Sequence, residues 1–191
     1  MIRMSSAVGR RAIFTIPVII ALGCIAGWLG NPPGPDNPWF AVLAKPALFP
    51  APMLFLTVLL ILFVMVGLAL AIVLAAPPSR AKVVGLALFV VQLALNFLWT
   101  PTFFAAHRMA AALEVLIVLD FVVLMTTIAF FGVSRRAGWL FAPCLAWVLF
   151  GSYLNYALVI GNPASLEGEE GPTVATAGAI AGLPPGGSGT I

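Results

Sequence analysis

Apolar residues run along this chain in five long blocks, not in the short alternating patterns that are typical of soluble domains. The blocks cover residues 12–29, 51–75, 83–104, 109–131 and 139–160. A helix needs about 20 consecutive apolar residues to cross roughly 30 Å of hydrocarbon, and backbone amides in lipid must be paired within their own segment. The pattern therefore predicts an all-α membrane protein, a bundle of five transmembrane helices. A transmembrane barrel is excluded, because its strands would alternate apolar and polar residues.

The connection between the first two blocks differs from the others. Three connections are short and are marked by proline or by basic residues, at 77–79, 107–108 and 134–136. Residues 30–50 form a longer, proline-rich segment that also contains Trp39, Phe40, Leu43 and Phe49. A linker that is exposed to water would not be expected to contain such large apolar side chains. We therefore expect a partly structured first loop that folds back over one end of the bundle.

The two ends of the chain are polar. Residues 1–11 are a basic N-terminal segment, and residues 161–191 are rich in glycine and proline, which predicts a disordered tail. The first block exceeds the 7–15-residue core of a signal peptide, so we expect a retained helix. One set of helix ends carries most of the basic residues, namely Arg3, Arg10, Arg11, Arg80, Lys82, Arg135 and Arg136, and the other set carries Lys45 and Arg108. The positive-inside rule then predicts a cytoplasmic N-terminus and a tail outside.

Composition narrows the possible functions. The chain is 62% hydrophobic and 8% charged, whereas soluble domains carry about 25% charged residues. The net charge is +3, but the basic residues lie at helix ends and form no stripe, which argues against nucleic-acid binding. Cys24 and Cys144 lie inside apolar blocks and have no metal-ligand spacing. With His107 as the single histidine, in a turn, we predict no catalytic triad and no metal site.

Polar and aromatic residues recur at helical spacing in the third and fifth blocks. The two stripes are Gln92, Asn96, Trp99 and Phe103, and Pro143, Trp147, Gly151, Asn155 and Asn162. Amide side chains in hydrocarbon need partners, so both stripes should face the bundle interior. By themselves they fit either interhelical hydrogen bonds with aromatic filling or a ligand site.

Three segments carry a resemblance to a known family. They are Trp39-Phe40-x-x-Leu43-x-Lys45-Pro46 with Phe49-Pro50 and Phe55, Gln92-Leu93-x-Leu95-Asn96-x-x-Trp99 with Phe103-Phe104, and Pro143-Cys144-Leu145-x-Trp147-Val148-x-Phe150 with Leu154-Asn155 and Asn162. In this order, over residues 13–162, the chain resembles the translocator protein family, also called the tryptophan-rich sensory protein (TspO/MBR) or peripheral benzodiazepine receptor family.

The resemblance implies a five-helix bundle whose first loop closes a pocket, with no covalently bound cofactor and a porphyrin such as protoporphyrin IX as ligand. It implies a membrane-embedded sensor or carrier. The residues that it places at the ligand are Trp39, Phe49, Asn96, Trp99, Phe103, Trp147 and Gly151, and those that it makes structural are Lys45, Pro46, Gln92, Pro143, Asn155 and Asn162. No basic residue follows Tyr153 or Tyr156 in a cholesterol-recognition pattern, which favours a bacterial protein that binds no sterol.

The second helix departs from the family pattern. The family usually has Trp-Val-Phe followed by Trp-Thr-x-Leu-Tyr, where this chain has Met53-Leu54-Phe55 and then Leu59-Leu60-Ile61-Leu62-Phe63. Some bacterial members resemble light-dependent porphyrin-degrading enzymes that rely on paired tryptophans. Leu59 in place of one tryptophan would leave Trp147 alone, so this enzyme activity is an alternative and not our first expectation.

Asp120 is a carboxylate in the middle of a predicted helix, where it costs about 2.5–3.5 kcal/mol on insertion scales. It is either an acid hydrogen-bonded to a neighbouring helix or a proton-coupled or ligand-orienting group. The second possibility leaves a proton-coupled exporter as a further alternative function. Ala81 and Gly85 are spaced for close helix packing, either within one chain or in a homodimer, and the family's frequent dimerisation favours the dimer.

Overall fold

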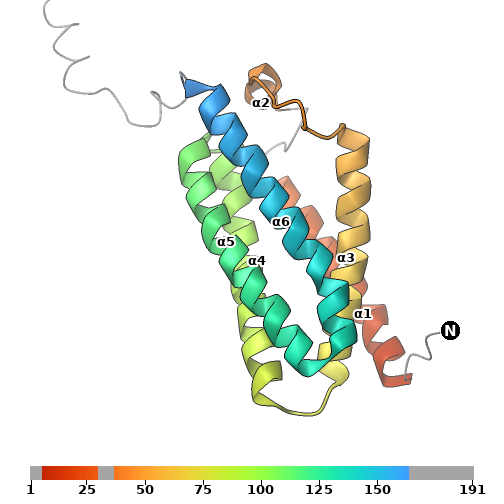
Figure 1. Ribbon diagram of the computed structural model, residues 1–191. Helices are drawn as coiled ribbons and strands as arrows, with labels where there is room; N and C mark the ends of the chain where they lie inside the picture. The colour runs from red at the N-terminus through yellow and green to blue at the C-terminus, as the bar shows by residue number, and fades with distance from the viewer. Residues whose placement is uncertain (1–5, 30–36, 164–191) are drawn as a thin grey trace, which may run out of the picture.

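The computed structural model describes residues 6–29 and 37–163, in which five long helices and one short helix form a single bundle (Figure 1). The long helices are α1 (Ser6–Trp28), α3 (Pro52–Ala75), α4 (Arg80–Phe104), α5 (Met109–Val133) and α6 (Arg135–Gly161), and the short one is α2 (Pro38–Val42). Each long helix is long and apolar enough to cross a membrane. The predicted all-α bundle of five transmembrane helices is therefore confirmed. The expectation for the tail beyond residue 163 lies outside the described residues.

The helices extend past the apolar blocks at several ends. The blocks placed helix starts at residues 12, 83 and 139, whereas α1 begins at Ser6, α4 at Arg80 and α6 at Arg135. The reason is that basic side chains with long apolar stems can continue a helix while they carry their charge to the membrane surface. Apolar patterning marks the part of each helix that lies in hydrocarbon, and it misses the turns outside.

Close packing of α1 against α3 makes the first helix part of the bundle. A Cβ added at Gly67 would lie 2.8 Å from the Cα of Ile16, so the two backbones approach closely there. Thr15 Oγ1 donates a hydrogen bond to the Gly67 carbonyl at 2.7 Å. Around the bundle the order of neighbours is α1, α3, α6, α5 and α4, and α4 also contacts α1.

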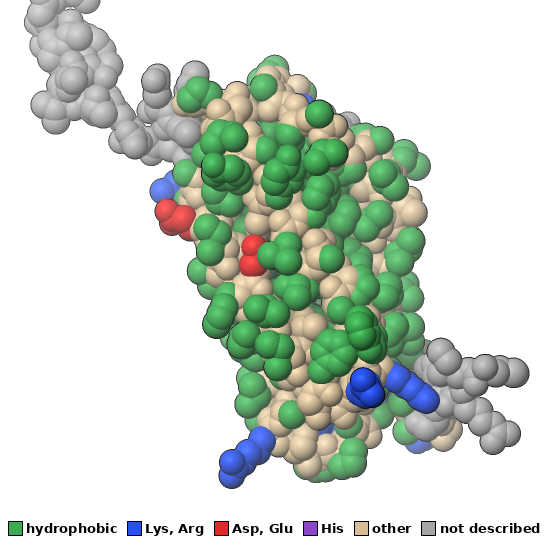
Figure 2. All heavy atoms as spheres, in the orientation of Figure 1, with side chains coloured by type: hydrophobic (Ala, Val, Ile, Leu, Met, Phe, Trp, Pro, Cys, Tyr) green, Lys and Arg blue, Asp and Glu red, His purple; other side chains and the backbone are tan. Residues whose placement is uncertain are grey.

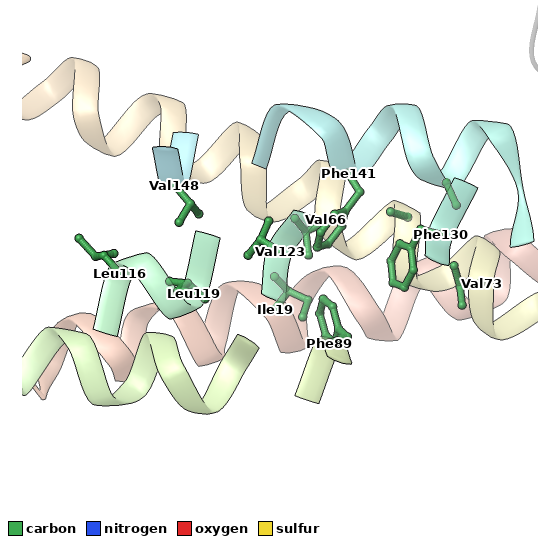
Figure 3. Close-up of a cluster of buried hydrophobic side chains, with 12 residues drawn as sticks. Ile19, Val66, Val73, Phe89, Leu116, Leu119, Val123, Phe130, Phe141 and Val148 are labelled. Carbon is green, nitrogen blue, oxygen red and sulfur yellow. The ribbon is translucent and has the colours of Figure 1, made fainter. Parts of the chain in front are cut away.

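All five long helices contribute to the core of the bundle, with Ile19 of α1 packed beside residues of α3, α4, α5 and α6 (Figure 3). Phe89 of α4, Phe130 of α5 and Phe141 of α6 pack together, and the Phe130 and Phe141 ring centroids are 4.9 Å apart. A Cβ added at Gly85 would lie 3.1 Å from the Phe130 ring. Within the chain, Gly85 therefore lets α4 approach α5, which accounts for one small residue of the predicted small-residue spacing.

Apolar side chains cover the outer surface between the two ends of the bundle (Figure 2). Most of the basic side chains gather at the end where α1 begins and where α3 joins α4 and α5 joins α6. At this end Lys82 Nζ donates to the carbonyls of Leu74 and Ala76 and so satisfies the end of α3. Ser79 Oγ accepts from the Lys82 amide and caps α4. A single residue, Ser134, connects α5 to α6.

Most polar side chains inside the span bond to their own helix. Six of them donate to the carbonyl four residues earlier: Thr57, Asn96, Thr100, Thr102, Thr126 and Thr127. Bonds between spanning helices come instead from Thr15, Trp99, Ser152 and Asn155. Polar residues in hydrocarbon are thus paired largely within single helices.

Candidate ligand site beneath the first loop

Residues 37–50, which we call the lid, lie over the end of the bundle formed by α4, α5 and α6. The lid starts with α2, where Asn37 Oδ1 accepts from the Phe40 amide at 3.1 Å and caps the helix. Asn37 Nδ2 donates to the Phe104 carbonyl at 3.1 Å and fixes this cap to α4. Pro38 occupies the first helical turn, where its missing N–H is harmless. The partly structured first loop that we expected is confirmed for the described residues.

Aromatic rings join the lid to α4. Phe40 and Phe103 are both 2% exposed. The Trp39 and Phe103 centroids are 5.6 Å apart, as are those of Trp99 and Phe103 and of Phe40 and Phe49. Four of the predicted ligand residues, Trp39, Phe49, Trp99 and Phe103, therefore meet in one aromatic group, which we call the lid cluster. Rings at 4.5–7 Å in tilted arrangements stabilise such contacts by about 0.5–1.5 kcal/mol per pair.

His107 also contacts the lid, a role that we did not predict. It lies in the turn between α4 and α5 at φ 58°, in the left-handed region, which is uncommon outside glycine. Its ring stacks on Trp39 at 4.4 Å with 14° between the planes. The turn thus presents its histidine to the lid. The sequence signal was a lone histidine two residues before the start of a helix, which does not reveal a contact with a residue as distant in sequence as Trp39.

Three of the predicted structural residues, Asn162, Lys45 and Pro46, hold the far end of the lid. Asn162 Oδ1 accepts from the Ala44 amide at 2.8 Å, and its Nδ2 donates to the Ala44 carbonyl at 3.1 Å. Lys45 Nζ donates to the carbonyls of Phe40 and Ala41 and lies 4.7 Å from the centroid of the Phe40 ring. Pro46 accepts from the Phe49 amide in the turn that follows. The lid is therefore tied to α6 by the neutral hydrogen bonds of Asn162. It is tied to itself by the charge-assisted bonds and the cation–π contact of Lys45 and by the backbone turn at Pro46.

Asn155 links three helices directly below the lid cluster. Its Oδ1 accepts from Trp99 Nε1 at 3.3 Å, and its Nδ2 donates to the Met109 carbonyl at 2.9 Å. Asn96, predicted at the ligand, instead donates to the Gln92 carbonyl of its own helix. Gln92 is buried, and its Oε1 has no hydrogen-bond partner among the described residues. The α4 stripe thus combines structural bonds with one unpaired buried acceptor.

Trp147 and Gly151 form a second group on α6. The Trp147 ring packs against Phe55 of α3 at 5.2 Å and against Phe150 at 5.8 Å. One turn further along, a Cβ added at Gly151 would meet nothing within 4 Å. Pro143 lies inside α6 one turn before Trp147. No ring contact joins Trp147 to the lid cluster within residues 37–163. Apart from Asn96, which bonds within α4, the predicted ligand residues lie in two groups, one packed and one beside open space.

Asp120 stands apart from both groups, at the contact between α5 and α6. Ser152 Oγ donates to Asp120 Oδ2 at 2.7 Å, and Asp120 Oδ1 is buried without a partner among the described residues. In this part of the chain no three His, Cys, Asp or Glu side chains gather as a metal site. The geometry so far provides a lid, a packed aromatic cluster, and a tryptophan beside open space.

Comparisons with known proteins agree in pointing to one family. The sequence profile of the TspO/MBR family matches residues 15–160. The chain is similar to the tryptophan-rich protein TspO of Chlorobaculum tepidum, with 37% identity over 157 residues, which cover 81% of this chain and 99% of that protein. It is also similar to the protein CrtK of Rhodobacter capsulatus, at 35% identity over 65% of this chain and 79% of the relative. The human translocator protein is 41% identical over 42% of this chain and 47% of its own length.

Proposed function

Because the chain belongs to the TspO/MBR family, we propose that it is a membrane-embedded binding protein, a sensor or carrier, for a porphyrin or a related flat apolar ligand. The ligand lies between the helices, against Trp147 and Gly151 of α6 and below the lid. No part of this proposal requires a covalently bound cofactor.

The open space beside Gly151 is the observation that carries the proposal. Trp147 and Gly151 are one turn apart on α6 and therefore share a helix face. The indole packs against Phe55 at 5.2 Å, which fixes its orientation, and the missing Cβ leaves room directly beside it. A flat tetrapyrrole requires an aromatic face for stacking and apolar walls around it. Trp147 offers the aromatic face, and the space beside Gly151 leaves room for the ring system.

The contacts that hold the lid are weak enough for it to open and close over the ligand. The far end of the lid is held to α6 by the two Asn162–Ala44 hydrogen bonds. The α2 end is held to α4 and to the following turn by the Asn37–Phe104 hydrogen bond and the Trp39–His107 stack. Neutral hydrogen bonds contribute only about 0.5–1.5 kcal/mol each, so their release is accessible at ambient temperature. Most of the basic residues in the described chain gather at the opposite end of the bundle (Figure 2), and the positive-inside rule then directs the lid away from the cytoplasm.

Light-dependent degradation of porphyrin has less support. The aromatic neighbours of Trp147 within the described residues are Phe55 and Phe150, and neither is a tryptophan. The α3 helix contains no tryptophan, so a tryptophan pair between α3 and α6 is absent. We therefore propose binding without turnover.

A titration of the protein in lipid nanodiscs with protoporphyrin IX tests this proposal. Tryptophan fluorescence should fall with saturation at micromolar ligand, and Trp147→Leu should weaken binding about ten-fold. Trp139→Leu is the matched control, because Trp139 is 67% exposed and packs against Phe131 at the far end of α6. Binding that does not saturate, or equal affinities of the two variants, would refute the proposed site. Loss of the Soret band with turnover under illumination, abolished in Trp147→Leu, would establish the enzyme instead.

A further inference from the structure

Two of the long helices carry the same five-residue pattern in their first turns. Residues 10–14 of α1 read Arg-Arg-Ala-Ile-Phe, and residues 135–139 of α6 read Arg-Arg-Ala-Gly-Trp. Both helices begin at the same end of the bundle (Figure 1). Helix α3 lies between them, so the two segments occupy separate parts of the perimeter. We call them the α1 and α6 basic segments.

The two basic segments have the same pattern of burial, position by position. Both arginines of each segment are exposed. The alanine is buried, at 6% for Ala12 and 0% for Ala137, and the aromatic residue is exposed, at 72% for Phe14 and 67% for Trp139. The aromatic residue follows the arginines by four and three positions, so it shares their side of the helix. Side chains lean toward the N-terminus of their helix, which directs each ring toward the guanidinium groups.

The four arginines have no partner of opposite charge within the described residues. In residues 6–29 and 37–163 the acidic side chains are Glu114 and Asp120, both on α5. Asp120 lies thirteen residues before Val133, where α5 reaches this end of the bundle, which is about 20 Å along the helix. On the face shown in Figure 2, the basic side chains at this end have no acidic neighbour. Unpaired positive charge therefore remains at the membrane surface.

The α6 basic segment also offers an uncharged hydrogen-bond donor. The Trp139 ring packs edge-on against Phe131 of α5, with 5.4 Å between centroids and 85° between planes, which fixes the indole. Its Nε1–H has no hydrogen bond within the part of the chain that the structure describes. Tryptophan rings at a membrane surface lie at the level of the lipid headgroups. The segment thus presents two guanidinium groups and, about 6 Å deeper along the helix, an unused N–H.

A phospholipid carries complementary groups in the same order along the membrane normal. Its phosphate lies toward water, its ester carbonyls lie just below, and its acyl chains continue into the hydrocarbon. Guanidinium groups bind phosphate oxygens through paired N–H bonds, and the indole N–H can donate to an ester carbonyl. A zwitterionic headgroup adds a cation that the arginines repel, whereas an anionic headgroup does not. Basic residues beside membrane helices attract anionic lipids for this reason.

We propose that the α6 and α1 basic segments each bind the headgroup of an anionic phospholipid. The α6 segment is the tighter site, because Trp139 supplies an N–H that Phe14 lacks. These sites are separate from the proposed porphyrin site, since Trp147 lies two turns further along α6 and packs toward Phe55 of α3.

Native mass spectrometry of the protein in neutral detergent micelles, titrated with lipid, tests the choice of headgroup. Phosphatidylglycerol should bind at least about five-fold more tightly than phosphatidylcholine. Glycerol 3-phosphate at the same concentration should not displace it, because the free phosphate brings no ester or acyl group. Equal affinities for the two lipids, or displacement by glycerol 3-phosphate, would overturn the proposal.

A substitution without change of charge separates a built site from general electrostatic attraction. Trp139→Leu keeps the net charge and should weaken the tighter binding of phosphatidylglycerol about two- to ten-fold, because it removes one hydrogen bond. Trp28→Leu is the matched control, since Trp28 is 76% exposed at the other end of α1 and has no arginine one turn before it. It should leave the affinity unchanged. Equal affinities of these two variants would mean that Trp139 takes no part in a lipid site.

A pair of arginine variants tests the pattern itself. Arg136→Gln and Arg80→Gln each remove one exposed positive charge from the same end of the bundle. Arg80 is followed at the same spacing by Val83 and Val84, not by an aromatic residue. A neutral micelle has no charged surface, so Arg136→Gln should weaken binding about five-fold and Arg80→Gln less than about two-fold. Far-ultraviolet circular dichroism checks that each variant is folded. An equal loss in both would reduce the binding to net charge and contradict the proposed sites.

Discussion

The contact of α1 with α3 at Gly67 permits a sharp test of the packing. A Cβ at this position would lie 2.8 Å from Ile16 Cα and 3.1 Å from Ile16 N, so the obstacle is backbone and not a flexible side chain. Gly67→Ala must push the two helices apart, and it breaks the bond from Thr15 to the Gly67 carbonyl. Overpacking costs about 1–3 kcal/mol, and the bond contributes about 0.6 kcal/mol in a membrane.

Helix propensity opposes this loss, since alanine is better than glycine by about 1 kcal/mol. The net destabilisation is therefore roughly 0.6–2.6 kcal/mol. Gly151→Ala is the matched control: it has the same gain in propensity, and its new methyl group meets nothing within 4 Å. The gain in helix propensity cancels when the free energies of unfolding of the two variants are compared. Their difference then reports only the packing and the hydrogen bond at Gly67, and it should be about 1.6–3.6 kcal/mol. Unfolding by SDS in mixed micelles, followed by far-ultraviolet circular dichroism, measures it. Equal stability of the two variants would refute the close approach of α1 to α3.

Three further predictions follow from the site. Asn155→Leu removes the bonds to Trp99 and Met109 and should destabilise the bundle by about 1–2 kcal/mol in the same SDS titration; a stability like that of the parent would mean that the three-helix link contributes nothing. Gly151→Leu should lower protoporphyrin IX affinity at least about ten-fold without loss of stability, and undiminished affinity would place the ligand elsewhere. Asn162→Ala should speed hydrogen exchange at Ala44 and ligand dissociation, because it frees the lid from α6; unchanged exchange would show that the aromatic contacts alone hold the lid.

The sequence was sufficient for the existence of the five long helices and insufficient for the contacts between them. Apolar runs determine what can cross a bilayer, so residues 51–75 and 109–131 differ from α3 and α5 by no more than two residues. Helix α2 was not predicted, because its five residues are too few for a periodic pattern, and Asn37 followed by Pro38 was its one local sign. The stripe containing Asn96 looked uniform in sequence, yet Asn96 bonds to its own helix while Trp99 bonds to Asn155. Side-chain rotamers decide between these two outcomes, and spacing does not encode them.

Self-contained pairing of polar side chains has a consequence for how the chain enters the membrane. The hydroxyls and amides that bond to the carbonyl four residues earlier are satisfied as soon as their own helix forms, so such a segment can leave the translocation channel alone without carrying an unpaired group into lipid. Asp120 is different, because its partner Ser152 belongs to the helix synthesised next. Since Ser134 alone separates the two helices, we expect α5 to wait for α6 and the two to be released into the bilayer together as a hairpin.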